Sequence, residues 1–219
     1  MIKVEFHCHT RYSKDSLVKI EDLLATCRRK RIDKLVITDH NTIEGARRAR
    51  ELDPDRFIVG EEIMTNQGEI LAFFVKDEVP AKLSAQKTLD LLHAQGAFIT
   101  VSHPFDTRRK GHWLVEDLIN ILPGIDAIEV FNSRCMLPDS TTQAASFAQQ
   151  HHLLCTVGSD SHSLMEVGRS TLVLPDFMDR ATLRISLLPA ETNTRLSPLW
   201  VHFISRYASW RKRYSTSKK

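Results

Sequence analysis

The amino-acid sequence predicts an α/β barrel followed by a basic helical tail. Short apolar runs alternate with amphipathic stretches over the first two-thirds of the chain, and this alternation is typical of parallel βαβ units. About seven such runs in one domain favour a closed barrel over an open doubly wound sheet. No GxGxxG motif follows an expected strand, and no GxxxxGK motif with a following Ser or Thr is present. Their absence argues against a dinucleotide-binding or P-loop fold.

The first half of the chain contains four expected strands and two expected helices. Amphipathic spacing predicts helices over residues 18–31 and 42–52, and Pro54 ends the second of them. A turn at residues 66–68, Asn-Gln-Gly, separates the last two strands of this half. The apolar runs of strand length are residues 2–7, 34–38, 57–59 and 69–75.

The second half of the chain repeats this pattern. Gly96 follows an expected helix over residues 84–95, and glycine is the residue that most often caps a helix C-terminus. The same spacing predicts helices over residues 114–122 and 141–152, and the alternation stops after Pro189. The strands expected in this half are residues 97–102, 126–131, 153–157 and, as a further candidate, 167–174.

Composition excludes several classes of protein. With 42% hydrophobic and 26% charged residues, the chain resembles a globular protein and not a disordered or fibrous one. The four cysteines are widely spaced and form no CxxC pair, so we expect free thiols in a reducing compartment. There is no signal-peptide pattern and no run of about 18 apolar residues, which predicts a cytoplasmic protein with no membrane partner.

Charge divides the chain into two parts. We expect residues 1–180 to form the barrel domain and residues 181–219 to form a basic C-terminal extension. From residue 180 onward there are nine Lys or Arg and one acidic residue, Glu191, for a net charge of +8. The preceding residues have a net charge of −5, so a mildly acidic body carries a basic tail.

The basic tail allows two interpretations. Residues 198–214 have the spacing of one amphipathic helix, which could pack Leu199, Phe203 and Tyr207 on the barrel and leave its charges in solvent. Alternatively, aromatic side chains among basic ones suit the bases and phosphates of an oligonucleotide. The basic residues expected to contact an oligonucleotide are Arg211, Lys212, Arg213, Lys218 and Lys219.

Residue types that bind metals gather where the expected strands end. In parallel α/β folds these carboxyl ends meet on one side of the domain and form the reactive site. One residue separates His7 from His9 and Asp160 from His162, so each pair can point to one face and share an ion. The strand-end residues are His7 and His9, Asp39 and His40, Glu61 and Glu62, His103, Asn132 and Arg134, and Asp160 and His162.

These strand ends supply more nitrogen and oxygen ligands than one tetrahedral zinc ion can use. A cluster of two or three divalent ions with a bridging carboxylate fits the number better. A metal-free mechanism has less support, because the sequence has no GxSxG motif. Cys8 lies between two candidate ligands and would point to the opposite face, where a core role is expected.

Five short motifs occur in a characteristic order along the chain. They are FHCHTRYSKD at residues 6–15, ITDHNTI at 37–43, GEEI at 60–63, SHPF at 102–105 and GSDSH at 158–162. Over about residues 1–175 their order and spacing resemble the PHP (polymerase and histidinol phosphatase) superfamily, in particular a compact branch without a capping insertion. This resemblance implies a distorted (β/α)7 barrel with a trinuclear metal site that often holds manganese, zinc or iron.

The resemblance also implies ligands for each ion. Those of the first ion would be His7, His9, Glu62 and Asp160. Those of the second ion would be Glu62, as a bridge, and His103. Those of the third ion would be Asp15, His40 and His162. Glu69 stands where many family members have a histidine ligand of the second ion, and the alternative is that Glu69 is a solvated charge at a strand end.

The chemistry that the resemblance implies is direct hydrolysis of a phosphate ester by a metal-bound hydroxide. One guanidinium group can donate to two phosphate oxygens at once, so arginines are the candidates to hold the phosphate. Arg134 is the first candidate because it follows a strand end, and Arg169 is the second. We expect His103 to be both a catalytic residue and a metal ligand. The loop arginines that offer alternatives are Arg11, Arg108 and Arg109.

Nucleotide phosphoesters are the substrates that the resemblance implies, as 3′,5′-bisphosphonucleotides, nucleoside monophosphates or short oligonucleotides. Three other functions stay open. The protein could be a nucleic-acid-binding or polymerase-associated module with little catalysis, a small-molecule phosphatase of the histidinol phosphate type, or an amidohydrolase with the same barrel and metals. Binding of nucleic acid without hydrolysis would distinguish the first of these from a phosphoesterase.

Overall fold

The apolar runs of the sequence form one nine-stranded sheet in the computed structural model of the protein, which describes residues 1–216. The spatial order of the strands is β7-β6-β5-β4-β3-β2-β1-β8-β9. The strands are β1 (Ile2–Cys8), β2 (Lys34–Ile37), β3 (Phe57–Met64), β4 (Glu69–Phe73), β5 (Phe98–Val101), β6 (Ala127–Asn132), β7 (Leu154–Gly158), β8 (Ser170–Leu174) and β9 (Glu191–Thr194). Cys8 and Ser161 form a parallel bridge that brings the end of β7 to β1, so the sheet curves into an almost closed barrel.

The barrel is not parallel throughout, and the prediction of uniform βαβ units is wrong for part of the sheet. Strand β4 runs antiparallel to both β3 and β5, and β8 runs antiparallel to β1. Residues 65–68 are too few for a crossover helix, so β3 and β4 must form a hairpin. The other neighbouring pairs from β1 to β3 and from β5 to β7 are parallel, as expected. The distorted barrel that the sequence motifs imply is therefore confirmed.

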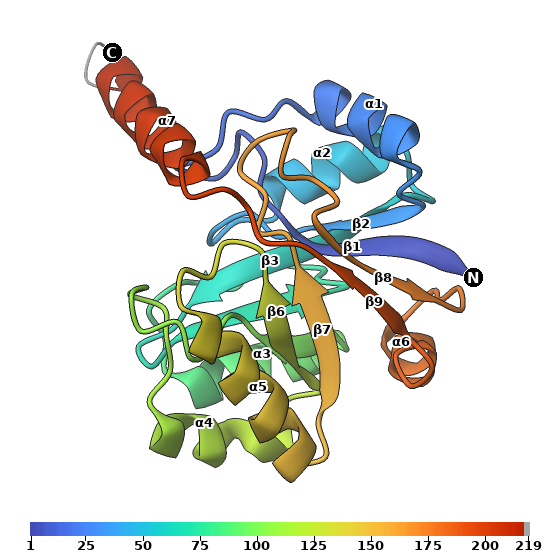
Figure 1. Ribbon diagram of the computed structural model, residues 1–219, viewed down its shortest axis with the longest axis vertical. Coiled ribbons are helices and arrows are strands. Elements are labelled where there is room, and N and C mark those ends of the chain that lie inside the picture. The colour runs from blue at the N-terminus through green and yellow to red at the C-terminus, as the bar shows by residue number, and fades with distance from the viewer. Residues whose placement is uncertain (217–219) are drawn as a thin grey trace.

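Helices cover the outside of the barrel, with α1 and α2 on one side and α3, α4 and α5 on another (Figure 1). Gly96 caps α3 in the left-handed conformation, with φ of 72°, as its sequence position predicts. The helices are α1 (Ile20–Lys30), α2 (Glu44–Leu52), α3 (Ala85–Gln95), α4 (Val115–Ile121), the 3-10 turn η1 (Leu122–Gly124), α5 (Pro138–Gln150), α6 (Arg180–Ser186) and α7 (Val201–Thr216).

The end of the barrel where the parallel strands begin is closed by α6. Leu183 of α6 and Phe177 before it pack with Phe6, Phe98 and other buried residues of the strands. Arg180 and Arg184 pair with the buried Asp126 at the start of β6. With this end filled, the opposite end, where the parallel strands finish, is the one available for a site.

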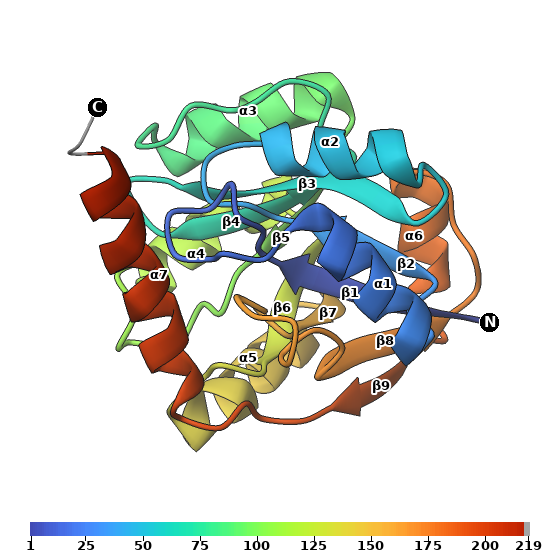
Figure 2. The same ribbon diagram turned by 90° about the horizontal axis from the view of Figure 1, so that it is seen from above.

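Residues beyond position 180 continue the sheet before they leave it. Strand β9 pairs with β8. Neither β9 nor α6 was expected from the sequence. Helix α7 then projects away from the barrel in Figure 1, and in Figure 2 it runs along one side of the molecule. None of the helices within residues 1–216 is both long and apolar enough to cross a membrane.

Helix α7 meets the body through a different face from the expected one. Val201 and Ala208 are buried, whereas Leu199, Phe203 and Tyr207 are exposed. The expectation that the latter three pack on the barrel is therefore wrong. The small side chain of Ala208 allows close approach, and the Lys212 ammonium donates to backbone carbonyls of the loop that follows β1.

Candidate metal centre

All nine predicted metal ligands lie in one cluster at the end of the barrel where the parallel strands finish. Glu69 joins it because β4 is antiparallel, so the first residue of β4 lies beside the last residues of β3 and β5. Within each of three groups of side chains, the potential ligand atoms lie within 4.8 Å of one another. The groups are His7, His9 and Glu62; His40, Glu62 and Glu69; and His9, His40 and His162.

The first predicted ion site lies around the end of β1. The Nε2 atoms of His7 and His9 are 3.1 Å apart. His9 Nε2 is 3.4 Å from Glu62 Oε2 and 3.2 Å from Asp160 Oδ1. These four side chains are buried, and their potential ligand atoms face one another as the sequence motifs imply.

The second predicted site lies between β3, β4 and β5. His103 Nε2 is 3.2 Å from Glu62 Oε1 and 3.4 Å from Glu69 Oε2. Glu69 is only 7% exposed, which does not agree with the alternative of a solvated strand-end charge. Glu62 contributes atoms to both the first and the second site, which is the geometry required of a bridging carboxylate.

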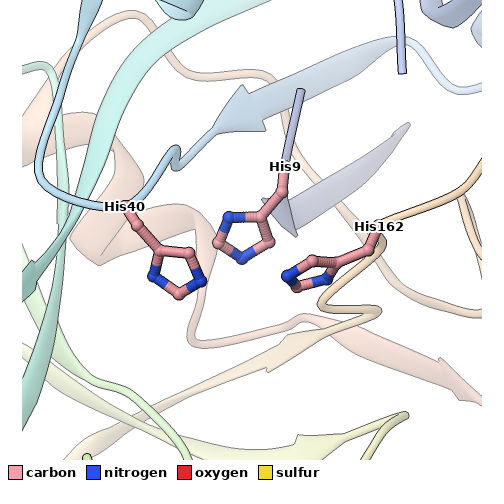
Figure 3. A group of neighbouring side chains, drawn as sticks. All are labelled: His9, His40 and His162. Carbon is pink, nitrogen blue, oxygen red and sulfur yellow. The ribbon is translucent and has the colours of Figure 1, made fainter. Parts of the chain in front are cut away.

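The third predicted site is closer to solvent. Asp15 Oδ2 is 3.4 Å from His40 Nε2 and 3.3 Å from His162 Nε2. The rings of His40 and His162 flank that of His9, with centroids 4.4 Å and 4.2 Å away (Figure 3). Asp15 and His40 are half-buried, so this part of the cluster is the part that solvent reaches.

The cluster fits divalent ions. Oδ1 of Asp160 and Oε2 of Glu62 are shielded from water and accept no hydrogen bond, although imidazole nitrogens lie 3.2 Å and 2.9 Å from them. Oδ1 of Asp15 is also buried without a hydrogen-bond partner. Buried polar atoms without partners are costly, and a shared cation would satisfy oxygen and nitrogen lone pairs together.

Electrostatics favour the metal-binding protonation state at two of the ligands, His9 and Asp160. At His7 and His40 burial opposes protonation, but Glu62 and other nearby carboxylates outweigh it and hold the pKa of both imidazoles well above the usual value, so a cation would have to displace their protons. Burial, with His162 and His40 nearby, lowers the pKa of His9 to about 3, so its imidazole is neutral at pH 7. Burial opposes ionisation of Asp160, but Arg109 and His7 outweigh it and hold the pKa of this carboxyl well below its usual range. A neutral imidazole and an ionised carboxylate are the forms that coordinate a cation.

A buried carboxylate that was not predicted from the sequence contacts a ligand histidine on the side of its ring that faces away from the other ligands. Glu129, in the middle of β6, lies 2.9 Å from His7 Nδ1 and accepts hydrogen bonds from the His103 backbone N–H and from Asn132. Its position in an otherwise apolar strand, Ala-Ile-Glu-Val-Phe, is the signal that could have identified it. A carboxylate at this nitrogen of His7 orients the ring toward the other ligands.

Ser13 and Asp39 support the side of the cluster near His9. Ser13 Oγ lies 3.1 Å from His9 Nδ1 and donates to Asp39 Oδ1 at 2.7 Å. It also accepts the backbone N–H of His40. Asp39 therefore acts on a histidine through a serine hydroxyl, and it does not point at the potential ligand atoms itself.

The arginines differ in their relation to the cluster. Arg134 is buried, and its Nη1 lies 3.1 Å from His162 Nδ1 while its Nε donates to Glu166. Arg109, weighed only as an alternative, donates to Asp160 Oδ2 at 2.6 Å. Arg169 donates from Nη1 to the Leu196 carbonyl and makes no hydrogen bond or ion pair with the clustered ligands within residues 1–216, so its role in holding a phosphate stays a prediction.

Comparison with known families agrees with this geometry. The sequence model of the PHP domain matches residues 5–101, and that of the PHP-associated region matches residues 138–183. The chain belongs to the PHP family. The matched regions contain eight of the nine clustered residues, from His7 to His162, and His103 lies two residues beyond the first match.

Relatives of this PHP chain come from archaea and bacteria. The uncharacterized protein MJ0417 of Methanocaldococcus jannaschii is 35% identical over 172 residues, which cover 77% of this chain and 69% of that protein. The 5′-3′ exoribonuclease Rnm of Salmonella typhimurium is 30% identical over 95 residues, which cover 41% of this chain and 32% of Rnm. The crystal structure of a candidate metal-dependent phosphoesterase from Bifidobacterium adolescentis has the same fold, with a TM-score of 0.64 and 19% identity over 84% of this chain and 95% of that one.

Proposed function

We propose that this PHP protein is a metal-dependent hydrolase of phosphate esters. The observation that carries the proposal is the cluster of nine buried or half-buried imidazoles and carboxylates, several of whose atoms have no hydrogen-bond partner. Such a donor set suits two or three divalent transition-metal ions such as manganese, zinc or iron. Ions bound there would lower the pKa of water and neutralise charge on a phosphate.

The protein's own residues would have distinct roles in this reaction. His7, His9, Glu62 and Asp160 would hold the first ion, with Glu129 fixing the ring of His7. Arg109 and Arg134 border the cluster and offer guanidinium N–H groups to the oxygens of a phosphoryl group. Charge stabilisation by such preoriented donors is the main contribution expected of the protein in phosphoryl transfer.

A nucleotide is the substrate class that we propose. The partial similarity to an enzyme named as an exoribonuclease, over 95 residues, supports it. Nucleoside mono- and bisphosphates and short oligonucleotides are therefore the compounds to test first. A non-catalytic nucleic-acid module has less support, because the complete ligand set is present in the structure.

The test is a panel of phosphate esters assayed with metal-stripped protein. Mn²⁺, Zn²⁺ or Fe²⁺ should restore hydrolysis of at least one nucleotide, and a chelator should abolish it. The matched variants are Asp160→Ala, which removes a ligand, and Asp176→Ala, which removes an exposed carboxylate from the opposite end of the barrel. Hydrolysis that persists after verified metal removal would contradict the proposal.

We also propose that α7 binds single-stranded nucleic acid. Phe203, Tyr207, Trp210 and Tyr214 are 53–69% exposed and, at spacings of four, three and four residues, form one stripe along the helix. Tyr207 and Trp210 have ring centroids 5.9 Å apart, and those of Trp210 and Tyr214 are 4.9 Å apart. The basic residues of this helix are Arg206, Arg211, Lys212 and Arg213.

Exposed aromatic rings with basic neighbours match the bases and phosphates of a single strand. Of the basic residues proposed from the sequence to contact it, Lys218 and Lys219 lie outside the described residues. Trp210→Ala should weaken binding of a labelled oligonucleotide about tenfold, whereas Met178→Ala, on the opposite end of the protein, should not. Equal binding by both variants across a salt series would refute this role. If the protein instead dimerises as its concentration rises, and Trp210→Ala abolishes this, the aromatic stripe of α7 binds a second copy of the chain.

A further inference from the structure

Helix α7 contacts the loop that carries Asp15, the half-buried ligand of the third predicted ion site. The Lys212 ammonium donates to the backbone carbonyl of Arg11 at 2.6 Å and to that of Ser13. These two residues belong to the loop between β1 and α1, which lies beside α7 in Figure 1. Both family matches end before α7, so this contact comes from a part of the chain that neither family model covers.

Asp15 is the predicted ligand with the least support from regular secondary structure. The ligands of the first and second sites lie in a strand or within two residues of its end. Asp15 instead lies in the middle of the segment between Cys8 and Ile20, which contains no helix or strand. Such a loop has no ladder of backbone hydrogen bonds to order it. The position of the Asp15 carboxylate therefore depends on what the loop contacts.

The contact with Lys212 fixes the part of this loop that faces the cluster. Ser13, whose carbonyl accepts from Lys212, places its hydroxyl 3.1 Å from His9 Nδ1 and accepts the His40 backbone N–H at 3.0 Å. Asp15 follows two residues later, with its Oδ2 3.4 Å from His40 Nε2. An ammonium group has three N–H donors, so one lysine can satisfy two loop carbonyls at once. Lys212 thus supplies hydrogen bonds that a neighbouring strand would supply in a sheet.

The helix that carries Lys212 is also attached to the other side of the third site. Arg134 Nη2 donates to the Val201 carbonyl at 3.0 Å, and Nη1 of the same arginine lies 3.1 Å from His162 Nδ1. An α-helix rises about 1.5 Å per residue, so α7 spans about 16 Å from Val201 to Lys212 as one element. The helix therefore connects the segment of His162 with the segment of Asp15.

We propose that Lys212 is a positioning residue that holds the Asp15 loop in the conformation that binds the third ion. The inference rests on the metal binding that the proposed function requires, and it adds a role for the C-terminal helix. Without this contact the ion itself must order the loop, and the conformational entropy lost in that step weakens ion binding. The first and second ions depend on residues in or near strands, so their binding changes less.

The metal-binding test compares wild type with Lys212→Met, Lys212→Arg and Lys87→Met. Methionine removes the charge and the donors, arginine keeps both, and Lys87 is an exposed lysine of α3. Metal-stripped protein is titrated with Mn²⁺ against a chelator of known affinity. Lys212→Met should bind the weakest equivalent about tenfold less tightly and the others as wild type does, and Lys212→Arg should recover most of the loss. Lys87→Met should match wild type.

Two results of this titration would overturn the inference. Equal affinity of wild type and Lys212→Met for every equivalent would show that the contact does not position a ligand. Tighter binding by Lys212→Met would show that the charge of the lysine repels the ion more than its hydrogen bonds assist binding.

Hydrogen exchange of metal-free protein tests the loop without any ion. The Arg11 N–H donates to the Val18 carbonyl at 2.7 Å and the Ser13 N–H to the Thr10 carbonyl at 3.0 Å, so both report whether the loop keeps its conformation. Both should exchange about tenfold or more faster in Lys212→Met and near the wild-type rate in the other two variants. If wild type binds no metal and hydrolyses no ester but this difference is seen, the proposed function fails and the positioning of the loop stands. Equal exchange in all four proteins would overturn the inference and leave the hydrolase intact.

Discussion

Replacement of Glu129 by glutamine tests whether the buried carboxylate behind the cluster controls metal binding. Its two oxygens meet three donors: His7 Nδ1 at 2.9 Å, the His103 backbone N–H at 2.9 Å and the Asn132 amide at 3.0 Å. A glutamine keeps the size but replaces one oxygen by a donating NH2 group. Oε1 faces His7 alone, whereas Oε2 accepts from both the His103 N–H and the Asn132 amide. The glutamine NH2 group therefore costs less at the position of Oε1, where it opposes one donor instead of two.

In that orientation His7 must accept at Nδ1 and carry its proton on Nε2, the atom that lies 3.1 Å from His9 Nε2 and would bind the ion. Loss of such an orienting partner typically lowers metal affinity about 10- to 100-fold, or by about 1.4–2.7 kcal/mol. The assay is competition with a chelator of known affinity on metal-stripped Glu129→Gln. Glu116→Gln, an exposed carboxylate on α4, is the control. If folded Glu129→Gln binds metal as tightly as wild type, Glu129 does not orient a ligand.

His9→Ala should reduce kcat about 100-fold or more with an unchanged circular dichroism spectrum, because it removes a buried ligand; retained turnover would exclude the first ion site. Gly111→Ala should lower the metal content found by elemental analysis, since the new Cβ would lie 2.0 Å from Glu69 Oε2 and displace this carboxylate; wild-type content would show that Glu69 binds no ion. Burial raises the pKa of Glu61 from 4.5 to about 8, so the folded protein keeps a proton that the unfolded chain loses. The free energy of unfolding should therefore fall between about pH 5 and 8, by up to about 1.4 kcal/mol per pH unit from this group, and Glu61→Gln should flatten the fall in urea titrations. A slope unchanged by this substitution would contradict the raised pKa.

The metal ligands could be predicted from the sequence because each follows or ends a short apolar run. Strand ends are local features, and the parallel part of the fold brings them together without further information. Glu69 and Asp15 are the exceptions. Glu69 begins a strand and joins the cluster only because β4 is antiparallel, and Asp15 lies in the loop between β1 and α1, away from any strand end. Motif resemblance identified both residues, whereas periodicity alone would have placed Glu69 at the opposite end of the barrel.

Residues that depend on long-range contacts were predicted less well. Arg109 and Arg169 both lie in loops, and no local pattern distinguishes the one that reaches Asp160 from the one that reaches Leu196. Strand β9, Glu-Thr-Asn-Thr, has no apolar residue and is exposed throughout, so its conformation depends on pairing with β8. The orientation of α7 follows from Val201 and Ala208, whose small apolar side chains give a weaker signal than the aromatic residues on the outer face.

The interior position of β1 in the sheet has a consequence for the order of folding. β1 is the first of the nine strands along the chain, yet its neighbours are β2 and β8, and it pairs with residues 172–174 through Ile2, Lys3 and Val4. The metal cluster likewise joins His7 to residues up to His162. A growing chain can form the β1–β2–β3 unit early, but it cannot complete the ion sites until most of the barrel has been made. We therefore expect metal binding to come late in the synthesis of each chain, and bound ions would mark molecules in which the residues after β7 have already met β1.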